Sequence, residues 1–284
     1  MFCTELPHRG ILEIQGEDRA SFLQGLITND ITLVTPERAI YAALLSPQGR
    51  FLYDFFIIEI EGSYFLDVEK DRLEALLKKL NLYKLRSRVT LTPRFDLTVF
   101  ALWGEGIAPH LGLSEEMGRA HHGIFMDPRL LELGARALGE RPPKDFQPRT
   151  PFDYDLHRLV LGVPEGGRDL IPEKAILLES GLDELNAISW TKGCYMGQEL
   201  TARTKYRGLV RKRLFPVRIE GTIPTENVGI FSSGKEVGEM RTHNGSQGLA
   251  LLRIEAVKDQ EEFSWGRTCL RPYAPVWMRV NEPL

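Results

Sequence analysis

Residues 186–217, NAISWTKGCYMGQELTARTKYRGLVRKRLFPV, join four segments of different chemistry: an apolar run, a small-residue turn, a short polar segment and a run of cations. The apolar run at 187–190 predicts a short buried strand, because β-branched and aromatic residues alternate with small ones. The turn contains Gly193, which allows the backbone a positive φ beside Cys194. From Gly197 to about Arg203 we expect one or two helical turns. We expect the functional site of the chain in this stretch.

Cys194 is the cysteine that we expect to be reactive or metal-binding. It precedes a predicted helix N-terminus, and Lys192 lies two residues before it in the chain. A helix N-terminus and a nearby ammonium both favour the thiolate over the thiol. The alternative is that Cys194 is a small buried hydrophobe, as free cysteines often are. A turn beside glycine hides a side chain poorly, and on composition alone both interpretations stay open.

The run of cations places six positive side chains within eleven residues: Arg203, Lys205, Arg207, Arg211, Lys212 and Arg213. One interpretation is a surface for an anionic partner, such as a phosphate, a polycarboxylate tail or RNA. The other, slightly favoured, is a solvated strand face whose charges are met by nearby acids. The formal net charge of −3 excludes a protein that binds polyanions over its whole surface.

The composition of the 284-residue chain is that of an ordinary soluble protein, with 43% hydrophobic and 26% charged residues. No run approaches the roughly 18 apolar residues that span a membrane, so we expect no membrane partner. The first residues show neither a secretory nor a transit-peptide pattern, which predicts a cytoplasmic, bacterial-type protein. The three cysteines, Cys3, Cys194 and Cys269, are far apart and favour a reducing compartment. Without a CxxC pair, the chain cannot build a cluster site from local thiolates of its own.

The pattern of the remaining chain predicts an α+β protein that ends in a small all-β unit. Short strands and helices in the order β-α-β-β-α indicate a ferredoxin-like, antiparallel α+β unit. After Gly208, short strands separated by Gly, Pro and Asn predict an antiparallel barrel or sandwich. The strands expected first are 10–14, 39–46, 50–60, 63–68, 89–91 and 97–103, the helices 17–27, 71–82, 107–111 and 152–163, and the later strands 214–219, 229–231, 236–242, 248–253 and 276–280.

Asp54 breaks the pattern of the apolar strand 50–60, because it falls on the same face as Phe56 and Ile58. Burying an unpaired carboxylate costs several kcal/mol. Asp54 is therefore expected to be paired, protonated or placed at the edge of a cavity. A salt bridge with an arginine is the purely structural alternative.

The eight residues KGCYMGQE at 192–199 resemble the K-G-C-Y-x-G-Q-E signature of the YgfZ family. These are folate-binding proteins of iron–sulfur cluster biogenesis, related to the aminomethyltransferase (T protein) of the glycine cleavage system. The segments LTART at 200–204 and RKRLFPV at 211–217 resemble the Iba-type branch, whose mitochondrial members help to mature [4Fe–4S] proteins. The resemblance implies α+β units around a central pocket and a C-terminal antiparallel β-barrel. We place the units at residues 1–48 with 146–207, at 49–145 and at 208–284.

The resemblance also implies a tetrahydrofolate-type pocket. Tyr41 matches a tyrosine that lines the pterin pocket of T proteins, and Asp54 matches an aspartate that positions the reaction centre. Trp190 and Arg203 are further candidates for contact with the cofactor. The chain departs from the T-protein pattern at Val160, which stands where a glutamate holds the pterin ring. An apolar side chain there leaves pterin amines unpaired, at about 1–3 kcal/mol each.

The leading functional hypothesis is an iron–sulfur cluster assembly factor rather than a conventional enzyme. Cys194 supplies one thiolate to a transient [2Fe–2S] cluster, and an A-type carrier or a glutaredoxin supplies the others. Lys192 and Asp54 are the accompanying functional residues. The first alternative is a folate-dependent aminomethyl or one-carbon transferase, and the second is a tRNA-binding or tRNA-modification-related protein that uses the cationic run. A Cys–His nucleophile, with His157 as the histidine, is the weakest alternative.

Overall fold

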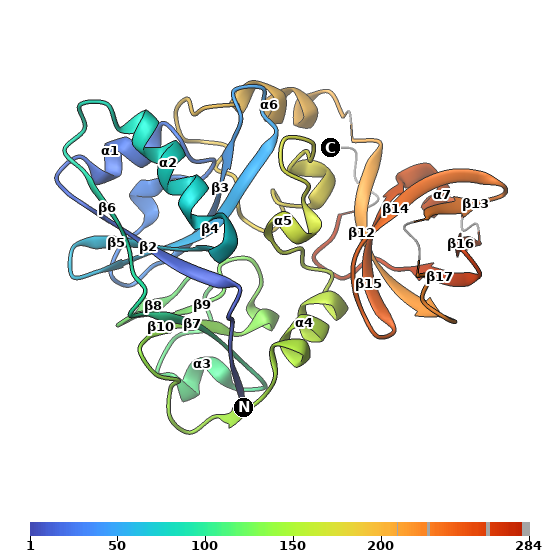
Figure 1. The fold of residues 1–284 in the computed structure, drawn as a ribbon, viewed down its shortest axis with the longest axis horizontal. Coiled ribbons are helices and arrows are strands. Elements are labelled where there is room, and N and C mark those ends of the chain that lie inside the picture. Colours follow the sequence, from blue (N-terminus) through green and yellow to red (C-terminus); the bar gives the residue numbers. More distant parts are fainter. Residues whose placement is uncertain (209, 226–227, 260–261, 280–284) are drawn as a thin grey trace.

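The computed structural model describes residues 1–208, 210–225, 228–259 and 262–279. Two α+β units lie side by side, and a small barrel (orange to red, at the right) stands apart from them (Figure 1). The fold is α+β and ends in a closed antiparallel barrel, as expected from the sequence. Among the helices of these described residues, none has both the length and the apolar character that a membrane crossing requires.

The first unit is a five-stranded sheet in the order β3-β4-β5-β2-β6. Its strand β4, which lies between β3 and β5, is buried on both faces, as its continuous apolar run predicted. Phe55 and Ile57 face the core beneath helices α1 and α2, and Phe56 and Ile58 face the second unit. The elements are β2 (Arg9–Gln15), α1 (Arg19–Gln24), η1 (Ile31–Leu33), β3 (Ile40–Leu45), β4 (Phe51–Ile60), β5 (Ser63–Glu69), η2 (Lys70–Arg72), α2 (Leu73–Lys84) and β6 (Thr90–Pro93).

The second unit is a six-stranded sheet in the order β11-β1-β7-β10-β9-β8. Its strand β7 directs Phe100 and Leu102 toward the short helix α3. The opposite face of β7 shares a core with the first unit, in which the Phe56 and Phe125 rings lie 6.0 Å apart. The elements are β1 (Phe2–Glu5), β7 (Thr98–Trp103), α3 (Ile107–His110), β8 (Ala120–His121), β9 (Ile124–Met126), η3 (Leu131–Leu133), β10 (Ala135–Gly139) and β11 (Gln147–Pro148).

The predicted boundaries between these two units are wrong at residues 48/49 and 145/146. The segment from Ser46 to Arg50 is a hairpin turn, closed by a 2.8 Å bond from Ser46 N to Arg50 O, and not a linker. The two strands that it joins, β3 and β4, pair directly. At the other boundary, Gln147 pairs with Phe2 inside the second sheet. The first sheet therefore takes strands from residues 9–93, and the second takes residues 2–5 with 98–148.

The C-terminal unit is a closed barrel in the order β12-β15-β14-β13-β16-β17. Four of its predicted strands are confirmed. The predicted strand 276–280 is wrong for residues 276–279, which are not in a strand, and residue 280 lies outside the described residues. Trp265 lies in the barrel core, in a strand that the sequence pattern missed. The elements are β12 (Lys212–Glu220), β13 (Gly229–Ser232), β14 (Lys235–Asn244), β15 (Gln247–Arg253), α7 (Ile254–Lys258), β16 (Phe263–Trp265) and β17 (Thr268–Pro272).

Three helices and a 3-10 turn connect the α+β units with the barrel: α4 (Pro151–Val160), α5 (Gly166–Asp169), η4 (Leu178–Ser180) and α6 (Gln198–Tyr206). Helix α4 begins at a capping box, in which Thr150 and Asp153 each accept a backbone N–H of the other. The stretch with the cysteine motif lies between η4 and α6. Its position is therefore set by both α+β units and by the entry into the barrel.

Candidate functional site

Cys194 is exposed, whereas its neighbours on either side are anchored in the protein. Lys192 is 9% exposed and Tyr195 is 6% exposed. The open span thus consists of Gly193 and Cys194 alone. The alternative of a buried, inert cysteine is wrong, and the loop presents one thiol to solvent in a fixed frame.

Lys192 holds the front of this loop. Its ammonium donates to three backbone carbonyl oxygens, those of Gln24 at 2.8 Å, Ile27 at 2.9 Å and Asn29 at 2.6 Å. These carbonyls lie at and just beyond the C-terminal end of α1, where helical carbonyls lack intrahelical partners. Burial lowers the pKa of the Lys192 ammonium to about 8. The sequence predicted Lys192 as a companion of the thiol, and the structure gives it the role of an anchor for the loop.

The far end of the loop is held by a close contact with the β3–β4 turn. Gly197 has φ of 80°, and a Cβ there would lie 2.5 Å from the Ser46 carbonyl oxygen. Opposite it, Gly49 has φ of 79°, and a Cβ there would lie 2.5 Å from Leu200 Cβ. Both glycines are needed for left-handed backbone and for close approach. Helix α6 begins directly after this contact and extends three residues beyond the predicted end.

The sequence-based account of the loop before Cys194 is wrong in two details. Residues 187–190 are not in a strand, because Ala187 O and Ser189 N bond to the side chain and backbone of Thr28 instead of to a neighbouring strand. Gly193 is not among the residues with positive φ. A Cβ built on Gly193 meets no atom within 4 Å. The conformational need for glycine that was predicted at this position is therefore absent.

The cationic run separates into paired and unpaired side chains. Lys205 Nζ lies 3.6 Å from the centroid of the Trp190 ring, which packs the start of the loop on the end of α6. Arg203 pairs with Glu199 one helical turn away, and Arg213 is buried against Glu184. Two other cations of the run, Arg207 and Arg211, are exposed and make no ion pair with any residue that the structure describes.

Tyr41 and Asp54, both predicted to contact a pterin, are buried and bonded to each other. The Tyr41 hydroxyl donates to Asp54 Oδ2 at 2.7 Å, and the two residues are 1% and 4% exposed. Asp54 is therefore paired, as its position on an apolar face required, although by a tyrosine and not by an arginine salt bridge. Burial, followed by the charge of Asp54, raises the pKa of Tyr41 well above its ordinary value.

The site residues predicted for a pterin do not converge on one cavity. Tyr41 lies in the core shared by the two units and Asp54 is buried beside it, whereas Trp190 packs against the margin of that core and Arg203 is exposed on α6. Val160 is 46% exposed, and its carbonyl accepts the Tyr273 hydroxyl at 2.9 Å. Four cavities formed by described residues, of about 250, 700, 290 and 90 Å³, are lined by other residues. The structure thus brings Lys192, Cys194 and Trp190 together and leaves Asp54 elsewhere.

A buried chain of charges lies between the two sheets and was not predicted from the sequence. Arg9 Nε donates to Asp67 at 2.6 Å, and Arg136 bridges Asp67 and Asp127 at 2.7 and 3.5 Å. Arg129 bonds to Asp127 at 2.8 Å. The Arg136 guanidinium lies 4.0 Å from the centroid of the Phe56 ring, which fills the space beside Tyr41. Directly bonded partners in this network are up to 69 residues apart in the chain, so no local pattern could indicate them.

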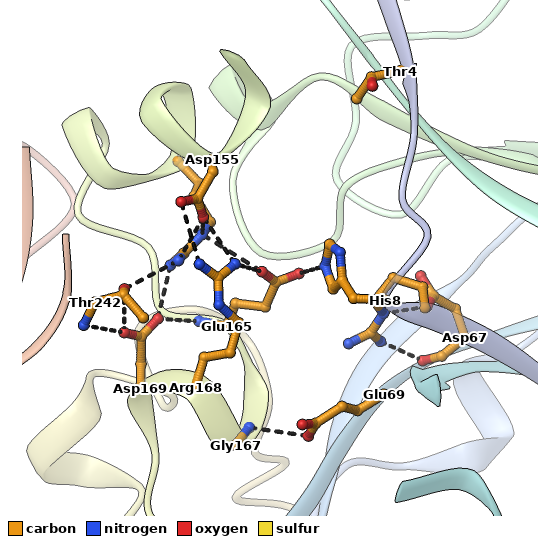
Figure 2. Close-up of polar contacts among 12 residues, drawn as sticks. Thr4, His8, Asp67, Glu69, Asp155, Glu165, Gly167, Arg168, Asp169 and Thr242 are labelled. Carbon is orange, nitrogen blue, oxygen red and sulfur yellow. Dashed lines mark hydrogen bonds and ion pairs between the residues drawn. The ribbon is translucent and has the colours of Figure 1, made fainter. Parts of the chain in front are cut away.

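A second network surrounds α4 and α5 and extends to the barrel (Figure 2). Arg158 donates to Asp169 at 2.7 Å and to Thr242 of β14 at 3.1 Å. Asp169 also accepts the Thr242 hydroxyl and backbone N–H, which ties β14 to the α+β units.

Near these bonds to β14, the Glu165 carboxylate accepts a hydrogen bond from His8 at 2.8 Å and another from Arg168 at 3.0 Å. The two donors come from separate segments of the chain (Figure 2). Burial alone would raise the pKa of Glu165, but the His8 bond and the Arg158 charge hold it well below its usual range. The cavity of about 250 Å³ is lined by His8, Pro151, Phe152, Tyr154, Asp155, Glu165 and Arg168.

The protein has a T-protein-like fold. It consists of two sheets with a shared core, a closed six-stranded barrel and a cysteine loop between these parts. The crystal structure of the glycine cleavage system aminomethyltransferase T from Bartonella henselae matches with a TM-score of 0.76. It covers 96% of this chain and 85% of that chain at 14% sequence identity, which shows the fold alone. A family model described as the CAF17 C-terminal beta-barrel domain matches residues 211–280.

The sequence relatives are more specific. The mitochondrial iron-sulfur cluster assembly factor IBA57 of Homo sapiens is 39% identical over 280 residues, which cover 90% of this chain and 78% of that protein. The Mus musculus protein of the same name is 38% identical over 283 residues, with the same coverage. The homolog from Pyricularia oryzae is 33% identical over 291 residues, covering 90% of this chain and 72% of that protein. The chain belongs to the IBA57 family of iron–sulfur cluster assembly factors.

The comparisons confirm the family that the KGCYMGQE motif suggested, and they correct one expectation. The sequence predicted a cytoplasmic, bacterial-type protein because the first residues lack a targeting pattern. The curated relatives from Homo sapiens, Mus musculus and Pyricularia oryzae are all mitochondrial proteins, which contradicts that prediction.

Proposed function

We propose that the protein assembles iron–sulfur clusters by providing one ligand, the thiolate of Cys194, to a [2Fe–2S] cluster held by a partner protein. Maturation of [4Fe–4S] proteins is the purpose that we assign to this step. The observation that carries the proposal is the exposure of Cys194 between two buried anchors, Lys192 and Tyr195. A ligand held in a fixed frame binds without the cost of ordering a flexible loop.

A partner is required because a [2Fe–2S] cluster takes four terminal ligands. Within the described residues, no group of three or more His, Cys, Asp or Glu side chains is placed to hold a metal. The partner therefore contributes three of the ligands and Cys194 contributes the fourth. In this step the thiol loses its proton to solvent and the sulfur donates an electron pair to iron, so no oxidant or reductant is consumed. A carrier of the A type or a glutaredoxin has the chemistry for this role.

The test compares Cys194→Ala with a cysteine control in the same chain. An anaerobically loaded [2Fe–2S] carrier is mixed with each variant, and the mixed complex is detected by native mass spectrometry and visible absorption. We expect wild type and Cys269→Ala to form the cluster-containing complex, because Cys269 is a half-buried barrel residue. Cys194→Ala is expected to form less than a tenth of it. Equal amounts with Cys194→Ala contradict the proposal.

Tetrahydrofolate stays a prediction from the resemblance, and no step of the proposed function passes through it. Tyr41 and Asp54 satisfy each other, and the exposed side chain of Val160 offers no hydrogen bond, so these positions do not match a pterin site. Anaerobic titration calorimetry with tetrahydrofolate decides the point. We expect no binding heat with the wild-type protein. Binding heat that is present in the wild type and absent in Asp54→Asn would restore the folate-dependent transferase as an alternative.

A further inference from the structure

We infer that the partner docks with its surface directly against the Gly193–Cys194 backbone and presents acidic side chains to a cationic surface formed by Lys205, Arg207 and Arg211. This inference rests on the proposed function and adds the contact geometry and the charge of the partner. The occupant is a cluster-carrying protein with an acidic rim around its own cysteine ligands.

The first observation concerns the space around Gly193. Gly193 lacks the positive φ that would require glycine, and a Cβ there would meet no atom of the chain within 4 Å. By contrast, Gly49 and Gly197, which face each other at the far end of the loop, have both the positive φ and the close neighbours. Glycine in a loop carries an entropic cost, since it loses more conformational freedom on folding than other residues. Among the described residues, neither a positive φ nor a close neighbour requires glycine at 193, and a partner that approaches the backbone closely does.

The second observation is the charge beside the loop. The contact between Lys205 and the Trp190 ring places the end of α6 on the same surface as the start of the cysteine loop. Arg207 and Arg211 follow α6, are exposed, and have no ion pair within the described residues. Lys205 makes no ion pair with any described residue. Exposed unmatched cations beside a thiol attract a partner of opposite charge and raise its rate of encounter.

The close approach is tested with Gly193→Ala, using Gly139→Ala as a matched control. Gly139 also lacks positive φ, and its nearest neighbour to a new Cβ is at 3.4 Å, an ordinary contact. We expect Gly193→Ala to keep the wild-type melting temperature and the wild-type rate of alkylation of Cys194 by iodoacetamide. Its affinity for the [2Fe–2S]-loaded carrier should fall at least tenfold, while Gly139→Ala binds as wild type. Wild-type affinity of Gly193→Ala overturns the inference.

The charge is tested with the double variant Arg207→Glu/Arg211→Glu against Lys79→Glu/Arg86→Glu, which makes the same change of net charge on α2 and just beyond it. We expect the first variant to bind the loaded carrier with an on-rate at least tenfold lower at low salt, and the difference to shrink as salt rises. Equal loss in both double variants overturns the inference, as does an effect on tRNA retention without an effect on the carrier. Cys194→Ala, measured beside them, reports on the proposed function alone: if it binds the loaded carrier as wild type does while Gly193→Ala does not, the cluster ligand is wrong and the docking surface stands.

Discussion

At the scale of single residues, Lys192 shows how one buried charge can serve a neighbouring exposed thiol. Its three acceptors are backbone carbonyls at the end of helix α1 and in the turn after it, where carbonyls lack an intrahelical hydrogen bond. The Lys192 ammonium also lies 5.4 Å from the centroid of the Tyr195 ring, on the other side of Cys194. Lys192 and Tyr195 thus brace each other across the exposed span, and the position of the thiol depends on an amine that takes no part in ligation.

Lys192→Met is expected to lower the free energy of unfolding by about 1–3 kcal/mol at pH 7, because carbonyls near the end of α1 lose their donor. The folded-state pKa of about 8 lies below the ordinary 10.5. Between these two values the unfolded chain binds more protons than the folded one, so wild-type stability gains from this group as pH rises from about 8 to 10.5. Below pH 8 the contribution is constant.

Urea unfolding of both proteins from pH 7 to 10.5 measures this, with Lys79→Met, a half-buried lysine of α2, as the control. The difference in stability between wild type and Lys192→Met should widen with pH above about 8. A constant difference over the whole range would mean that the buried amine does not titrate as described.

At the scale of secondary-structure elements, the contact between the β3–β4 turn and the start of α6 positions the cysteine loop. The turn is local, and its Pro47 and Gly49 are typical of a type I turn, whereas its partner Gly197 is far away in the chain. Two left-handed glycines that face each other allow the backbones to approach within reach of van der Waals contact. The first sheet therefore holds the far end of the cysteine loop in place through this contact.

Gly197→Ala is expected to destabilise the protein by about 1–3 kcal/mol, because the new Cβ meets both an unfavourable φ and the Ser46 carbonyl. Gly62→Ala is the matched control: its φ of 78° is equivalent, and a Cβ there meets no atom within 4 Å. Chemical denaturation should show a larger loss for Gly197→Ala than for Gly62→Ala. If both variants lose the same free energy of unfolding, the effect comes from the unfavourable φ alone and the packing of the turn on α6 contributes nothing.

The elements that the sequence predicted well are those with strong local patterns. The strand β4 was predicted correctly because its apolar run is continuous. The apolar run at 187–190 was mistaken for a strand because Thr28, far away in sequence, satisfies its backbone groups. Of the candidate site, the sequence indicated Cys194 and the helix after it, whereas it left the exposure of the thiol open. The anchoring of Lys192 was not, since its acceptors are carbonyls more than 160 residues distant.

At the scale of the whole molecule, buried polar contacts join the barrel to the α+β units beside an apolar cluster of Leu159, Leu214 and Leu249. Asp169 accepts from Arg158, from the backbone of Glu165 and from Thr242 of β14. Arg158 is 1% exposed, so its charge is compensated only by the carboxylates around it. Removing one member of a buried ion pair leaves an uncompensated charge, which costs more than the pair itself contributes.

Asp169→Ala is therefore expected to lower the free energy of unfolding by about 3–5 kcal/mol and to weaken the coupling between β14 and the rest of the chain. Because the barrel has its own closed sheet and core, we expect calorimetry to resolve its unfolding as a separate transition in the variant. Asp96→Ala, which removes an exposed carboxylate paired with Arg94, should cost no more than about 1 kcal/mol and leave a single transition. A single transition in Asp169→Ala, with a loss as small as that of the control, would show that contacts other than the Arg158–Asp169–Thr242 network join the two parts.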